Sequence, residues 1–124
     1  MDAEIVTIYR EEDNEKIGRI RKVSENVWQP ETIFGCSIGK ASSKELATEH
    51  IEKIGMDCLI DVWEIFDSEI QDWFSCKLNE INENKVSAII TDFGHKRVYE
   101  IVNVNPPFAN TLRWSKLSLT TASS

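Results

Sequence analysis

The chain has 124 residues, of which 41% are hydrophobic and 28% are charged, and its formal net charge is −7 at pH 7. This length accommodates one domain, or two small lobes that share a core. The apolar content is unlike that of a disordered chain. The acidic balance argues against general nucleic-acid binding, because an acidic protein and a phosphate backbone repel each other.

Hydropathy and cysteine spacing indicate where the protein is located and whether it binds a metal. No apolar run approaches the ~20 residues that span a bilayer, and the start, MDAEIVTIYR, lacks the apolar core of a secretory signal. Cys36, Cys58 and Cys76 are too far apart for a CxxC metal site, and no histidine completes a close Cys/His pair. We therefore expect a cytoplasmic protein with reduced thiols, no metal, no cofactor and no membrane segment.

The N-terminal part predicts three strands separated by polar turns. Residues 4–9 alternate apolar and polar side chains, residues 19–23 place Ile20 between charges, and residues 27–34 form a third strand-like run. Pro30 cannot donate a hydrogen bond within a sheet. The third strand is therefore expected at an edge, or with a bulge at Pro30.

An amphipathic helix follows, ahead of Gly55. Ser42 and Glu45 match the capping box, in which Ser42 caps the first turn and Glu45 reaches back to it. Gly55 is expected to end the helix in the left-handed conformation. The apolar face at helical spacing consists of Leu46, Ala47, His50, Ile51 and Ile54. Residues 1–55 thus predict a βββα lobe.

Residues 56–116 contain short apolar runs at almost even spacing, a pattern typical of a small antiparallel barrel or sandwich. The runs are LIDVWEIF, DWFSCKL, VSAIIT, VYEIV and TLRW. The predicted fold class is α+β, mainly antiparallel β, in which the βββα lobe precedes a five-stranded SH3-like barrel. The small polar residues of 117–124 predict a flexible tail.

Two motifs resemble nucleotide sites without meeting their requirements. Gly35 and Gly39 are separated by three residues rather than the four of a P-loop, and Ala41 stands where the metal-binding hydroxyl belongs. The triplet Asp92-Phe93-Gly94 matches the metal-binding triplet of protein kinases, but the other kinase motifs are missing from the sequence. Neither motif predicts nucleotide chemistry.

The remaining chemical groups do not form a catalytic set either. Pairs among Asp57, Asp61 and Glu64 lack the third oxygen ligand that would specify a divalent ion. His50 is interpreted as a packed histidine of the helix, and His95 as an exposed turn residue. The sequence therefore predicts no enzyme.

The second half resembles the central strands of a Tudor domain, a five-stranded SH3-like barrel. The resemblance covers about half of the chain and rests on Trp73-Phe74, Cys76, Leu78 and Ile81, on the apolar strand 86–91, on the turn Asp92-Phe93-Gly94, and on Trp63 and Leu112-Arg113 at its flanks. Tudor domains hold a methylated lysine or arginine in an aromatic cage by cation–π attraction.

The resemblance implies a cage of Trp63, Phe74 and Phe93, with Tyr99 as a candidate fourth wall. The chain departs from the family because phenylalanines replace its usual tyrosines and because the loop 66–71 looks longer. The other interpretation is that the aromatic residues fill the core of a small barrel, since strand alternation turns half of them inward.

The predicted function is a small non-catalytic binding module for another protein or a peptide. The alternative is an acidic inhibitor or immunity-type protein that neutralises a basic partner, because nine acidic residues and one base, Lys53, lie between Glu45 and Asp72. A hydrolase or nuclease that uses Asp57, Asp61 and Glu64 is a third interpretation. An exposed aromatic groove would favour the module, and a continuous acidic face would favour the inhibitor.

Overall fold

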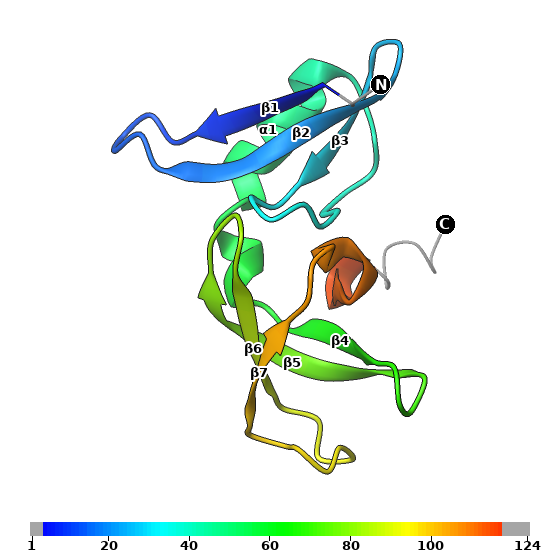
Figure 1. Ribbon diagram of the computed structural model, residues 1–124. Coiled ribbons are helices and arrows are strands. Elements are labelled where there is room, and N and C mark those ends of the chain that lie inside the picture. Colours follow the sequence, from blue (N-terminus) through cyan, green and yellow to red (C-terminus); the bar gives the residue numbers. More distant parts are fainter. Residues whose placement is uncertain (1–3, 118–124) are drawn as a thin grey trace.

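The computed structural model describes residues 4–117, which form two antiparallel sheets, one above the other, with a helix between them in the chain (Figure 1). The elements are β1 (Ile5–Tyr9), β2 (Lys16–Ser24), β3 (Val27–Glu31), α1 (Lys44–Ile54), the 3-10 turn η1 (Asp57–Ile60), β4 (Trp63–Asp67), β5 (Asp72–Ile81), β6 (Val86–Ile90), β7 (Ile101–Val104), the 3-10 turn η2 (Phe108–Asn110) and β8 (Leu112–Trp114). The predicted α+β, mainly antiparallel fold is confirmed. Except for Leu117, the predicted flexible tail lies outside the described residues.

The first sheet has the order β1-β2-β3, and α1 packs across one of its faces (Figure 1). Ala47 and Ile51 are the buried residues of α1. A Cβ added to Gly18 would lie 2.7 Å from Cγ2 of Ile51, so the helix approaches β2 at a place where only glycine leaves room. Pro30 lies in β3 at the edge of this sheet, as predicted.

The helix begins one residue later than the sequence predicts. The capping residue is Ser43, whose Oγ accepts a hydrogen bond of 3.2 Å from the N–H of Leu46. Ser42 is not available as the cap because its backbone pairs with Trp28 through bonds of 2.7 and 2.9 Å. The predicted capping box of Ser42 and Glu45 is therefore not formed, and this prediction is wrong.

Two further details of the helix prediction are wrong. Leu46 is 57% exposed and does not belong to the buried face. Gly55 is right-handed, with φ of −54°, and does not end the helix in the left-handed conformation. A Cβ on Gly55 would collide with the carbonyl oxygens of Ile17 and Ile51, so this glycine serves close packing rather than chain reversal.

A buried carboxylate of the first sheet, Glu31, is paired with two partly exposed arginines. Glu31 is 2% exposed, and its two carboxylate oxygens accept hydrogen bonds from Nε of Arg19 and Nε of Arg21 at 2.9 and 2.8 Å. A buried carboxylate is tolerated only when it is paired in this way. These ion pairs explain why arginines alternate along β2 with Ile20 between them.

The second sheet has the order β7-β6-β5-β4-β8, so the last strand of the chain lies beside the first strand of this sheet. Strands β7 and β8 are its edges, and within residues 4–117 no ladder joins them. The five strands predicted for the barrel are present, but closure of the barrel is not seen. Two strands start later than predicted. Strand β4 begins at Trp63 because residues 57–60 form η1. Strand β7 begins at Ile101 because the chain turns at Tyr99, where φ is +70°.

The two lobes share one cluster of buried side chains. Phe34, in the connection after β3, packs against Trp63 of β4 and Phe108 of η2 with ring centroids 5.7 and 6.0 Å apart. Trp63 is fully buried, and its Nε1 donates a 2.8 Å hydrogen bond to the carbonyl of Cys58. Residues 4–55 and 56–116 therefore both contribute side chains to one buried cluster.

The three free cysteines belong to this core. Cys36, Cys58 and Cys76 are each about 1% exposed or less. Burial raises the pKa of each thiol from 9.0 to about 12, so all three stay protonated at neutral pH. Buried neutral thiols behave as small apolar side chains.

Within the described residues, no helix is both long enough and apolar enough to cross a membrane.

Candidate binding site

The loop between β6 and β7, residues 91–100, presents two large aromatic side chains to solvent. Phe93 is 81% exposed and Tyr99 is 65% exposed, and their ring centroids lie 5.9 Å apart in an edge-to-face arrangement. We call Phe93 and Tyr99 the aromatic pair, and residues 91–100 the display loop. Neighbouring exposed apolar side chains are a mark of interaction surfaces.

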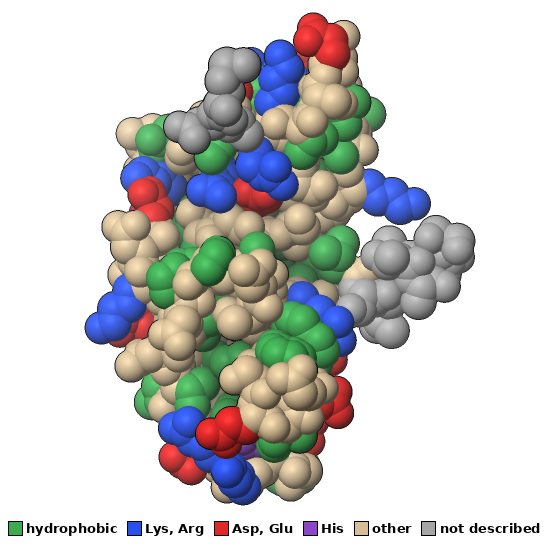
Figure 2. Space-filling model, turned by 45° about the vertical axis from the view of Figure 1, so that its right-hand side comes forward, with side chains coloured by type: hydrophobic (Ala, Val, Ile, Leu, Met, Phe, Trp, Pro, Cys, Tyr) green, Lys and Arg blue, Asp and Glu red, His purple; other side chains and the backbone are tan. Residues whose placement is uncertain are grey.

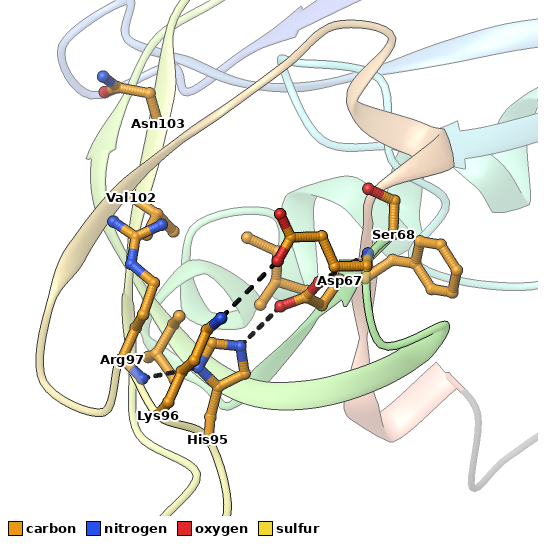
Figure 3. A pocket seen from close by; sticks show the side chains of 11 residues that line it. Asp67, Ser68, His95, Lys96, Arg97, Val102 and Asn103 are labelled. Carbon is orange, nitrogen blue, oxygen red and sulfur yellow. Dashed lines mark hydrogen bonds and ion pairs between the residues drawn. The ribbon is translucent and has the colours of Figure 1, made fainter.

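The buried side chain of His95 connects the display loop to β4 and fixes the loop backbone through hydrogen bonds. The residue is 4% exposed, and its Nε2 lies 2.8 Å from Oδ2 of Asp67, at the end of β4. On the other side of the ring, Nδ1 accepts a 2.9 Å hydrogen bond from the backbone N–H of Arg97. The ring of Phe74 meets the imidazole edge-on at a centroid distance of 4.5 Å. Figure 3 shows both polar contacts of His95.

These contacts assign the tautomer of His95. Because Nδ1 faces a backbone donor, it carries no proton, and the single proton of the neutral ring is on Nε2 and is donated to Asp67. The hydrogen bond from His95 lowers the pKa of Asp67, with help from the backbone N–H groups of Ile70 and Glu69 and against the effect of desolvation. Asp67 is therefore a carboxylate at neutral pH.

The backbone of the display loop is also fixed by hydrogen bonds. Oδ1 of Asp92 accepts the N–H of Gly94 at 2.8 Å, and the carbonyl of Ile90 accepts the N–H of Tyr99 at 2.6 Å. Tyr99 has φ of +70°. This conformation is unfavourable for residues other than glycine, and it persists only where the surrounding structure imposes it. The loop thus holds the aromatic pair in a defined place.

A hollow of about 430 Å³ lies between the β4–β5 turn, the display loop and β7 (Figure 3). Its lining includes Asp67, Ser68, Glu69, His95, Lys96, Arg97, Val102 and Asn103. The two basic residues face acidic neighbours, with Lys96 3.7 Å from Glu69 and Arg97 3.3 Å from Glu100. The hollow is therefore polar but locally balanced in charge.

In this arrangement His95 is not free to act as a general base. Both ring nitrogens of His95 are engaged, so the histidine cannot take a proton from Ser68 without first breaking one of its hydrogen bonds. Among the described residues, no group of three His, Cys, Asp or Glu side chains is placed to hold a metal ion.

The structure brings together only part of the predicted aromatic cage. Trp63 is 0% exposed and forms no wall of a surface site, because its position in β4 turns it toward the core. Phe74 is half-buried and packs on His95. Phe93 and Tyr99 do meet at the surface. Trp63 therefore fits the core interpretation, and the exposed candidates are reduced to the aromatic pair.

Sequence reasoning misplaced His95 and missed Asp67. His95 was expected at the surface because it lies in a turn, yet it is among the most buried polar residues. The two partners are 28 residues apart, and no local pattern connects the end of one strand with a turn after another. Only the pairing register of the strands in the second sheet would have shown that Asp67 and His95 lie side by side.

Part of the acidic segment that the structure describes is paired with basic side chains. In β4 and just before it, Glu64 pairs with Arg113 at 2.8 Å and Asp61 pairs with Lys116 at 3.1 Å. Exposed carboxylates remain on α1, at Glu45, Glu49 and Glu52. On the face drawn in Figure 2, acidic and basic side chains are interspersed.

In comparisons with known proteins, no family model, curated protein or solved structure matches this chain.

Proposed function

We propose that this protein is a small, non-catalytic cytoplasmic module that binds another protein or a peptide through the aromatic pair. The observation that carries the proposal is that Phe93 and Tyr99 are largely exposed on a loop whose anchor, His95, is almost completely buried. A merely solvated turn requires neither two large aromatic rings nor a buried polar anchor beneath them.

The physical argument concerns the cost of binding. Aromatic side chains, tyrosine among them, are enriched at protein interfaces and supply much of the binding energy. A loop that is already ordered loses little conformational entropy on association. Ile101, two residues after Tyr99 at the start of β7, is a further exposed apolar side chain, at 58%, and Lys96 and Arg97 of the same loop are ion-paired.

The order of the second sheet supports an SH3-like relationship. Strands β4 to β7 follow one another as a meander, and β8 returns beside β4, which is the order from which a five-stranded barrel would close. With Trp63 buried, we do not propose the full Tudor-type cage. We propose that Phe93 and Tyr99 receive an apolar or cationic side chain of the partner.

The test is affinity capture from the native source, followed by a binding measurement with the captured partner. Replacing Phe93 and Tyr99 together by alanine should weaken binding by about tenfold or more, with an unchanged melting temperature. The matched control is Ile60→Ala, because Ile60 is equally exposed, at 80%, but lies in η1. Equal binding by the double variant and the control would refute the proposal.

A second candidate, an acidic inhibitor of a basic partner, is favoured by one surface near the end of α1. A hollow there is lined by Glu11, Glu12, Glu52 and Asp57, with Arg10 and Lys53 as its basic residues. If this surface is the binding site, association should slow steeply with added salt. The variant Glu52→Lys should then lose binding while the double aromatic variant keeps it.

A further inference from the structure

The hydrogen bonds of His95 are complete only when its ring is neutral. Nε2–H donates to Asp67, and Nδ1 accepts from the N–H of Arg97 at 2.9 Å. A second proton would have to be placed on Nδ1, where it would face the Arg97 N–H, donor against donor. Protonation of His95 is therefore incompatible with the present contact between the ring and the backbone of the display loop.

The charges around His95 come from every neighbouring element. Strand β4 and the turn after it contribute Asp67 and Glu69, and β5 contributes Asp72, which lies opposite Asp67. Other residues that face the site from the strands are uncharged: Phe74 of β5, Ile90 of β6 and Val102 of β7. The display loop contributes Asp92, Lys96, Arg97 and Glu100. Asp67 is the one carboxylate bonded to the ring, and its other oxygen already accepts two backbone N–H groups.

Two effects act on a charged ring in its present site: burial disfavours it, and the carboxylate of Asp67 favours it. The side chain of His95 is 2% exposed, so a protonated ring would gain hydration by moving toward solvent. The N–H of Val98 is also bonded to the carbonyl of His95, at 3.2 Å, and Tyr99 follows directly with its imposed φ of +70°. Displacement of the ring removes one of the contacts that impose this conformation, and the 2.6 Å hydrogen bond from the Tyr99 N–H to the carbonyl of Ile90 is then its main remaining support.

We propose that His95 is a pH-sensitive switch of the binding surface: proton uptake at Nδ1 breaks the bond to Arg97, releases the display loop and disperses the aromatic pair. The proposal rests on the proposed binding function and adds its regulation. Binding should be strongest when His95 is neutral and should weaken on acidification once the ring takes up a proton.

The experiment is a pH titration of the free protein by NMR. The chain has two histidines, so the ring signals of His95 can be followed against those of His50, whose Nε2 lies 2.6 Å from the carbonyl of Ile38. The Arg97 amide and the Phe93 and Tyr99 ring signals should move with the midpoint of His95. The hydrogen-exchange protection of the Arg97 amide should fall by about tenfold or more over the same range.

Two variants separate the switch from general acid effects. In His95→Asn, the side-chain oxygen can still accept the Arg97 N–H but cannot take up a proton, so the pH dependence of the loop signals should disappear. In Asp67→Asn, the protonated ring loses its counter-charge, so the transition should move to lower pH. The second variant keeps the test available if the first does not fold.

Three outcomes would overturn the switch: His95 titrates while Arg97 and the aromatic pair stay in place, the loop signals of His95→Asn keep their pH dependence, or His95 stays neutral until the whole protein unfolds. Because these measurements use the free protein, their failure leaves the binding function standing. A failure of the alanine variants to lose partner binding would remove the binding function while the loop transition could still be observed.

Discussion

Two loops of this protein each carry a phenylalanine, and the two side chains have opposite surroundings. Phe34, in the connection after β3, is 5% exposed, whereas Phe93, in the display loop, is 81% exposed. Both loops also contain a residue with positive φ, Gly35 at +93° and Tyr99 at +70°. Local sequence and turn geometry therefore do not decide whether the aromatic side chain is core or surface.

The difference lies in what each loop faces. The connection after β3 folds back through bonds between Thr32 and Cys36 and inserts Phe34 between Trp63 and Phe108 of the other lobe. Phe93 makes its ring contact with Tyr99 of its own loop. One aromatic residue joins the lobes, and the other is held at the surface by a loop whose buried anchor is polar.

The largest expected effect is that of Phe34→Ala. Removing this ring leaves a cavity between the lobes and should lower the free energy of unfolding by about 3–5 kcal/mol. Calorimetry should show a single transition at a lower temperature, since the lobes share a core. Two separate transitions in the wild-type protein would show that the lobes unfold independently.

His95→Ala should have the next largest effect. It removes a buried ring that packs on Phe74, and it leaves the Arg97 N–H without its acceptor and Oδ2 of Asp67 without its donor, with an expected loss of about 0.5–3 kcal/mol. Urea denaturation at neutral pH measures this loss. A variant as stable as the wild type would mean that water replaces both contacts and that His95 does not hold the display loop.

The fold was predictable wherever local pattern and burial agree. The three strands of the first sheet and the helix follow from alternation and helical spacing, and the helix boundary was missed by one residue because the backbone of Ser42 is taken by Trp28. The site was less predictable. The Asp67–His95 contact depends on the register of strands far apart in sequence, and no turn pattern distinguishes a buried histidine from an exposed one.

Ser43→Ala should cost about 1 kcal/mol, because the hydroxyl caps the N–H of Leu46 at the start of α1. Ser42→Ala is the matched control: its bonds to Trp28 are made by the backbone and survive the substitution. The difference between the two variants in chemical denaturation measures the cap alone. A larger effect at Ser42 than at Ser43 would restore the capping box that the sequence suggests.

Phe93→Ala should have the smallest effect on stability, within about 0.5 kcal/mol, as for exposed positions that make little packing. Its side chain is 81% exposed and its ring contact is with Tyr99, itself 65% exposed, so removing it opens no cavity. A thermal melt of this variant, run beside Phe34→Ala, tests the contrast between the two loops directly. If Phe93→Ala melts at nearly the wild-type temperature, the ring is free to serve a partner. If its melting temperature falls as far as that of Phe34→Ala, Phe93 supports the fold, and a binding surface centred on the aromatic pair has to be abandoned.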